Sequence, residues 1–152
     1  MLEVLVTMLI IAVGLLGLAG LQVKGLQANH AAYLRTEATE RAYDMADRMR
    51  ANIKGVDAGD YNNLSGTPTD PGCITTDCTP KQLADYDVRQ WNLDNARLLP
   101  LGAGAVCLDS TPDDGTPTAP ACDGNGTAFA IKLWWDEGHN GQQKRFVTTF
   151  RP

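Results

Sequence analysis

The pattern of apolar and polar positions predicts a long helix at the start of the chain, with a first part that is apolar on every side. From Val4 to Leu21, eighteen consecutive positions carry no charge, and Thr7 is the one polar side chain among them. A helix crosses a bilayer in roughly 20 residues at ~1.5 Å rise per residue, so this run is long enough to span a membrane. Because its apolar residues occur all around the helix, lipid or other subunits must cover it.

After Lys24 the pattern becomes amphipathic, and no proline interrupts it. Apolar residues recur at the helical spacing of three and four, at Ala31, Leu34, Ala38, Ala42, Met45, Met49 and Ile53. Gly55 is the expected C-cap, since it directly follows the last basic residue, Lys54. The sequence therefore predicts one helix over residues 2–54. Residues 1–24 form its transmembrane or filament-core half, and residues 25–54 belong to a globular domain that extends to residue 152.

An acid and four glycines distinguish the apolar half from a plain anchor. Glu3 places a carboxylate at the head of the run, where insertion scales assign a buried acid a cost of about 2.5–3.5 kcal/mol. It is either an ordinary acid at the positive end of the helix dipole or a group whose charge a partner compensates. The glycines are Gly14, Gly17, Gly20 and Gly25. They either permit close helix packing or are weak points, since each costs roughly 1 kcal/mol relative to alanine.

The residues after Gly55 have the length of one small domain and contain all the prolines and cysteines. Residues 56–72 are rich in turn-forming residues and are expected to be a surface loop. A helix is predicted to begin at Thr79-Pro80, with Gln82 completing a capping box, and to end near Leu99.

This second helix is predicted to bury one apolar stripe and to expose its charged residues. Ala84, Val88, Trp91, Leu98 and Leu99 form the stripe, with Trp91 packed on a sheet, while Asp85, Asp87 and Arg89 are expected to face solvent.

Three strands are predicted to follow, over Gly104–Leu108, Thr127–Trp135 and Gln143–Phe150. Residues 138–141 (GHNG) supply the turn of a hairpin between the last two strands. The expected fold class is α+β: a long helix packed by its amphipathic half on a small antiparallel sheet, with one additional helix.

The four cysteines are expected to form disulfides in an exported domain. Cys73, Cys78, Cys107 and Cys122 are an even set, and their spacings of four and fourteen intervening residues do not match Cys-x2-Cys zinc knuckles. Three connectivities are possible. We expect Cys73–Cys78 and Cys107–Cys122, because each pair brackets one loop rich in Pro, Gly and Asp.

No catalytic arrangement stands out, so we expect a protein that is not an enzyme and uses no cofactor and no metal. The acids of one turn-rich loop, Asp109, Asp113, Asp114 and Asp123, are read as a solvated loop, with weak calcium binding as the alternative. The net charge of −5 would repel nucleic acid rather than attract it.

The segment LEVLVTMLIIAVGLLGLAGLQ resembles the N-terminal methylation motif of type IV pilins and pseudopilins, in which a glutamate precedes a long apolar helix. Glu3 stands at the position of that glutamate. The resemblance implies a pilin-like fold, and it implies that Glu3 neutralises the N-terminal amine of a neighbouring subunit during docking. CTPKQLADYDVRQWNLDNARLLP, AVCLDSTPDDG, AIKLWWDE and RFVTTF are similar to minor pilins of the type IV pilus modification protein PilV type.

The resemblance implies a minor pilin that primes or modifies pilus biogenesis, with other major and minor pilins and the inner-membrane assembly machinery as partners. Before assembly the subunit would sit in the lipid bilayer as a single-pass inner-membrane protein with a periplasmic C-terminal domain. Prepilin peptidase is a further partner if a basic leader precedes this chain, since the family's leader and its Gly–Phe junction do not precede Glu3 here. A pseudopilin of a type II secretion or DNA-uptake system and a membrane-tethered periplasmic enzyme are the alternatives.

Overall fold

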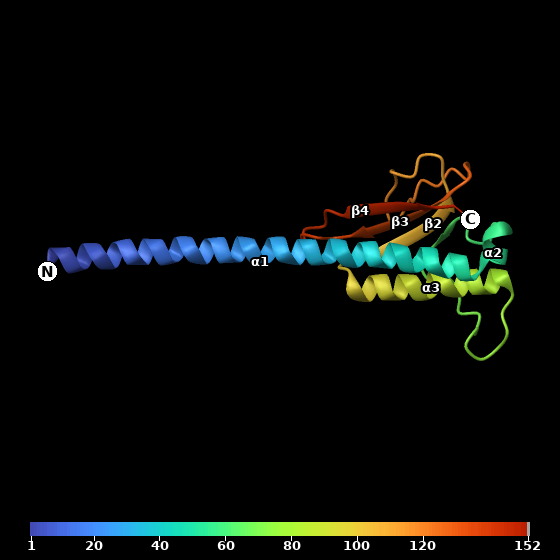
Figure 1. Cartoon of the computed structure of the whole chain (residues 1–152), viewed down its shortest axis with the longest axis horizontal. Coiled ribbons are helices and arrows are strands. Elements are labelled where there is room, and N and C mark those ends of the chain that lie inside the picture. The colour runs from blue at the N-terminus through green and yellow to red at the C-terminus, as the bar shows by residue number, and fades with distance from the viewer. Residues whose placement is uncertain (152) are drawn as a thin grey trace. The chain divides into compact units, whose positions relative to one another are not determined.

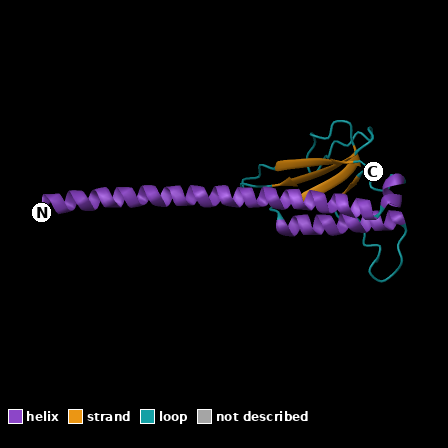
Figure 2. Ribbon diagram, viewed as in Figure 1, coloured by secondary structure: helices purple, strands orange, loops and turns teal. Residues whose placement is uncertain are grey.

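The structure, a computed structural model, describes residues 1–151 and groups them into two units that meet between Leu34 and Arg35. The first unit is the N-terminal part of one helix, α1 (Leu2–Ala51). The second unit holds the rest of α1, two further helices and four strands. Figure 1 shows them along the chain and labels all but the short first strand. Figure 2 separates the helices, strands and loops by colour.

The four strands form one antiparallel sheet in the order of the sequence. They are β1 (Leu64–Ser65), β2 (Ala103–Leu108), β3 (Phe129–Trp135) and β4 (Lys144–Phe150). The last three lie close to the predicted ranges, and β3 and β4 form the expected hairpin. Together with the long N-terminal helix and a further helix, this sheet is the α+β, pilin-like arrangement that the sequence predicted.

Helix α3 (Pro80–Leu98) covers one face of the sheet and begins as expected. Thr79 is its N-cap, Pro80 opens the first turn, and Gln82 closes a capping box with Thr79. Trp91 is fully buried, and a Cβ added to Gly104 of β2 would lie 2.2 Å from its ring. The glycine therefore leaves room for the indole on the sheet, as the sequence analysis expected for Trp91.

The α1 residues of the second unit pack beside α3 on this same side. Ala38, Ala42, Met45 and Met49 are each 0% exposed. The indole N–H of Trp91 donates to the backbone carbonyl of Arg41 over 2.7 Å. This bond satisfies the one polar atom of a large apolar side chain and holds α3 to α1.

The other face of the sheet is covered by the segment 109–126, which the sequence analysis did not anticipate. Every residue of β3 is buried, including those that alternate away from the helices. Lys132 of β3 is 0% exposed and binds Asp114 and the carbonyl of Pro120, both in this segment. A loop without regular structure therefore supplies a second cover for the sheet, on the face opposite the helices.

The first helix ends three residues before the predicted boundary, and Gly55 is not its C-cap. Asn52 interrupts α1 after Ala51 and caps a separate short helix, α2 (Ile53–Asp57). Gly55 lies inside α2, where an added Cβ would lie 2.6 Å from the Asn52 side chain. The helix thus ends at the polar capping residue Asn52, which the spacing of apolar residues does not indicate.

The segment 56–72 is only partly the predicted surface loop. It contains β1, and its Tyr61 is fully buried. The Tyr61 hydroxyl donates to Oδ2 of Asp87 over 2.6 Å, while Nδ2 of Asn52 donates to the same hydroxyl over 3.2 Å.

Asp87 is 7% exposed, so the prediction that it faces solvent is wrong. Burial raises the pKa of its carboxyl, and the Tyr61 and Arg48 contacts oppose that rise. Its position three residues after Ala84 and four before Trp91 places it on the buried stripe of α3.

Candidate assembly surface

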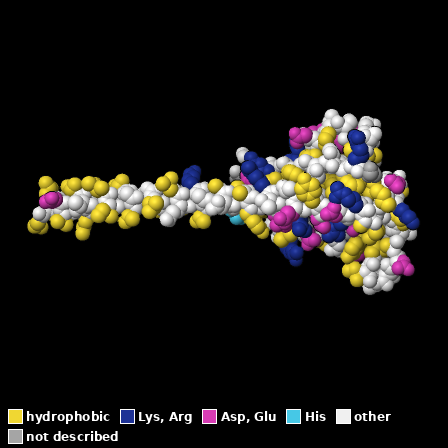
Figure 3. Space-filling view, viewed as in Figure 1, with side chains coloured by type: hydrophobic (Ala, Val, Ile, Leu, Met, Phe, Trp, Pro, Cys, Tyr) yellow, Lys and Arg dark blue, Asp and Glu magenta, His cyan; other side chains and the backbone are white. Residues whose placement is uncertain are grey.

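The N-terminal part of α1 presents apolar side chains that nothing in the described chain covers. Every residue from 1 to 30 is exposed. The helix is long and apolar enough to cross a membrane by length and composition, and its most apolar window is 0% buried. Figure 3 shows hydrophobic side chains around this part of the helix, with few charges between them. Such a surface is stable in water only when lipid or another protein covers it.

Glu3 lies in the first turn of α1, at the head of this apolar surface. The backbone N–H groups of a first helical turn have no partner within the helix, and they carry the positive end of the helix dipole. An acid there is therefore favourably placed even before a partner arrives. Thr7 needs no partner, because its hydroxyl donates to the carbonyl of Val4 over 2.9 Å.

The four glycines of the apolar half are all helical and all open to solvent. A Cβ added at Gly14, Gly17, Gly20 or Gly25 would meet nothing within 4 Å. No packing within the chain therefore requires glycine at these positions. The reason for glycine there lies either in contacts with other molecules or in the ease with which the helix unwinds.

An exposed ion pair holds the first residue of the second unit. The guanidinium of Arg35 donates to both carboxylate oxygens of Glu137, over 2.7 and 3.0 Å. The two-pronged geometry raises the pKa of Arg35 and lowers the pKa of Glu137. It fixes α1 at Arg35 to the turn between β3 and β4.

All four cysteines are paired, in the connectivity that the sequence analysis expected. Cys73 bonds to Cys78 with a Cα–Cα distance of 5.4 Å, and Cys107 bonds to Cys122 with one of 6.0 Å. The second bond ties the segment 109–126 to β2 beneath it. The first closes a loop of the segment between β1 and α3, whose Ile74 is 81% exposed.

The acids of the segment 109–126 are not simply a solvated run. Asp109 is 5% exposed and lies against Lys132, Asp113 pairs with Arg145, and Asp123 accepts from Ser110. The ligand atoms of Cys107, Asp109 and Cys122 lie within 4.8 Å of one another. Both sulfurs are in a disulfide, however, so they offer no thiolate to a metal.

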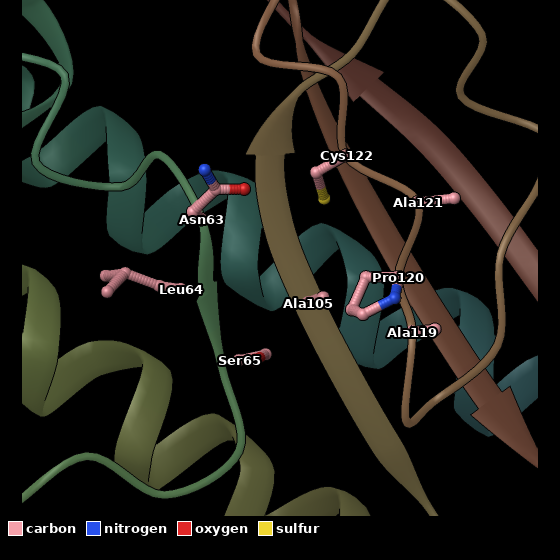
Figure 4. A pocket seen from close by; sticks show the side chains of 8 residues that line it. All are labelled: Asn63, Leu64, Ser65, Ala105, Ala119, Pro120, Ala121 and Cys122. Carbon is pink, nitrogen blue, oxygen red and sulfur yellow. The ribbon is translucent and has the colours of Figure 1, made fainter.

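A pocket of about 310 Å³ opens between β1 and this segment (Figure 4). Its walls are Asn63, Leu64, Ser65, Ala105, Ala119, Pro120, Ala121 and Cys122. These lining residues offer no carboxylate, imidazole or amine, so the pocket carries no group suited to acid–base catalysis.

A family model described as Type IV pilin Tt1218 matches residues 20–89, a range that covers the amphipathic half of α1, β1 and the start of α3. No curated protein and no solved structure matches the chain. The match supports the type IV pilin family, whose members are structural subunits, and it agrees with the pilin-like arrangement of the fold.

Proposed function

We propose that this protein is a minor pilin of a type IV pilus, an assembly subunit that primes or modifies pilus biogenesis. The observation that carries the proposal is the uncovered apolar helix of residues 1–30 on a domain whose own core is closed. The family match to type IV pilins supports it. In this function the apolar half sits in the inner membrane before assembly, with the C-terminal domain in the periplasm, and packs against other pilins in the filament afterwards.

Glu3 is proposed to select the docking position of the subunit. A carboxylate surrounded by apolar neighbours is tolerable only when an opposite charge compensates it. The amine at the N-terminus of a neighbouring subunit is the cation that a packed bundle of such helices would bring to this depth. The four glycines are proposed to let the helix unwind locally when it leaves the bilayer for the filament.

The test is incorporation into sheared surface filaments by a strain that lacks the chromosomal copy. Loss of the protein should reduce piliation or twitching, and re-expression should restore it. Glu3→Ala should leave membrane insertion intact but lower the amount in filaments, whereas Glu40→Ala, a change at another exposed acid of the same helix, should not. Equal incorporation of Glu3→Ala and wild type would refute the role of Glu3.

The deletion strain also separates the alternatives. Normal piliation together with lost protein secretion or lost DNA uptake would identify a pseudopilin. For the glycines, Gly14→Ala, Gly17→Ala and Gly20→Ala combined should slow incorporation without changing membrane insertion. Unchanged incorporation of this triple variant would assign the glycines to helix packing alone.

A further inference from the structure

Beneath the segment 109–126, the amine of Lys132 lies in contact with the carboxyl groups of Asp109 and Asp114. Nζ of Lys132 lies 2.5 Å from Oδ2 of Asp109, and both side chains are 0% exposed. This approach is not aligned as a hydrogen bond, and Oδ2 has no other hydrogen-bond partner within residues 1–151. A second carboxylate, that of Asp114, lies 2.8 Å from the same nitrogen.

We propose that Lys132 and Asp109 condense into an intramolecular isopeptide bond, with Asp114 as the group that moves the protons. Two buried charges in contact are costly to hold away from water, and their neutral forms, an amine and a carboxylic acid, are the two reactants of an amide. The cluster therefore holds the reactants in contact, in a place from which solvent is excluded.

The neighbours of Lys132 hold its amine in position. Ala105 of β2 and Val147 of β4 lie opposite it in the sheet, so its stem runs between small or apolar residues. The carbonyl of Pro120 accepts from Nζ over 2.8 Å. Fixing a nucleophile against its target in this way can replace a large part of the entropic barrier to reaction.

The two carboxylates differ in burial, and this difference assigns Asp109 as the group that is attacked and Asp114 as the group that carries protons. Asp109 is fully buried with its Oδ2 against Nζ of Lys132, so its carboxyl group is held where the amine can reach it. Asp114 is 45% exposed, and its hydrogen bond with Lys132 lowers the pKa of its carboxyl. It therefore stays ionised and can accept a proton from the amine.

The step balances without an oxidant, a reductant or a co-reactant. One proton passes from the Lys132 ammonium to the Asp109 carboxylate, which leaves both groups uncharged. The amine lone pair attacks the carboxyl carbon and a C–N bond forms, while Nζ gives a second proton to Asp114. Asp114 passes that proton to the departing hydroxyl, the C–O bond breaks, and one water leaves. The water can leave on the side of Asp114, whose side chain is 45% exposed.

The bond would cross-link β3 to the segment that covers it, independently of the Cys107–Cys122 disulfide. A subunit in a filament that bears load would then keep this face of the sheet closed even under reducing conditions.

Tryptic mapping of the full chain, purified in detergent and then reduced and alkylated, tests the proposal. Leu98–Lys132 contains no internal Lys or Arg, and the next basic residue is Lys144. An amidated Lys132 resists trypsin, so we expect a peptide Leu98–Lys144 that is lighter by one water, with fragment ions that map the link to Asp109. If the main product is a separate Leu98–Lys132 peptide whose mass shows no loss of water, the proposal is overturned.

Two variants assign the roles. Lys132→Arg keeps the positive charge but cannot form this amide, so it should be cleaved at position 132 and show no loss of water. Asp114→Asn should lower the linked fraction severalfold in freshly made protein. An equal linked fraction in Asp114→Asn and wild type would remove Asp114 from the reaction, and a link mapped to Asp114 itself would contradict the assignment of Asp109.

Discussion

Residues 1–30 and the second unit both contain part of helix α1, but they differ in how much of its surface is buried. The first segment exposes every side chain, and its one polar hydroxyl bonds to its own backbone. The second unit buries the α1 residues Ala38, Ala42, Met45 and Met49 completely. It also gives partners to the buried indole N–H of Trp91 and the buried hydroxyl of Tyr61. One part of α1 therefore has its apolar side chains buried within the chain, whereas the other part leaves its apolar side chains exposed.

Removing the apolar half should give the largest change in behaviour. A chain that starts at Gly25 should be soluble, monomeric and cooperatively folded, because the core of the second unit lies entirely beyond that point. The full chain should need detergent. Size-exclusion chromatography and thermal unfolding check both forms. An unfolded short chain, or a full chain that is monomeric without detergent, would break the comparison.

Two alanine substitutions of large apolar side chains, one in each region, should differ by several kcal/mol in their effect on the free energy of unfolding. Trp91→Ala should lower the free energy of unfolding by about 3–5 kcal/mol, since it empties the space over Gly104 and removes the indole hydrogen bond to the carbonyl of Arg41. Leu16→Ala removes an equally apolar but exposed side chain and should change it by less than about 0.5 kcal/mol. Near-ultraviolet circular dichroism of the remaining tryptophans during heating measures both. Similar losses in the two variants would contradict the separation.

Tyr61→Phe should have a smaller effect within the second unit. It takes the hydroxyl donor from the buried Asp87, a loss that costs about 1–3 kcal/mol. The pKa of Asp87 should rise further, because the Tyr61 hydrogen bond is one of the contacts that lower it. Tyr43→Phe, at an exposed ring, is the control and should leave unfolding unchanged. A stable Tyr61→Phe variant would show that the tyrosine–aspartate contact is not needed.

The smallest expected effect is a pH dependence from the loop that covers the sheet. The hydrogen bond from Ser110 lowers the pKa of Asp123 from 3.8 to about 2. A carboxyl whose pKa is lowered in the folded state stabilises the fold above about pH 4, and this contribution is lost as the pH falls toward 2. Asp123→Asn should therefore be less stable than wild type at pH 6, with the difference shrinking below pH 4. A difference that is constant with pH would contradict this account.

Local rules recovered much of the fold, because the signals concerned lie within a few residues of one another. The capping box at Thr79 and Gln82 was predicted and is present. The hairpin of β3 and β4 and the stripe with Trp91 follow from residue periods of two and of three to four. The two disulfides also follow a local rule, since each joins the ends of one loop.

The misses depend largely on partners far away in the sequence. Asn52 ends α1 while its side chain also donates to the carbonyl of Pro80 and to the Tyr61 hydroxyl. Asp87 is buried because Tyr61 supplies a donor from 26 residues away. The spacing of Asp87 from Ala84 and Trp91 already indicated burial, but its charge favoured the prediction that it faces solvent.

By itself the sequence determined the apolar and amphipathic halves of the first helix, the acid at its head and the class of fold, because hydrophobic period and helix propensity act along the chain. Only the tertiary structure decided that the acidic segment 109–126 closes the second face of the sheet. That closure requires Lys132, Asp109 and Asp114 to meet across a strand and a loop. Composition cannot distinguish a solvated acid from a paired one, since the difference lies in which cation the fold brings within 3 Å.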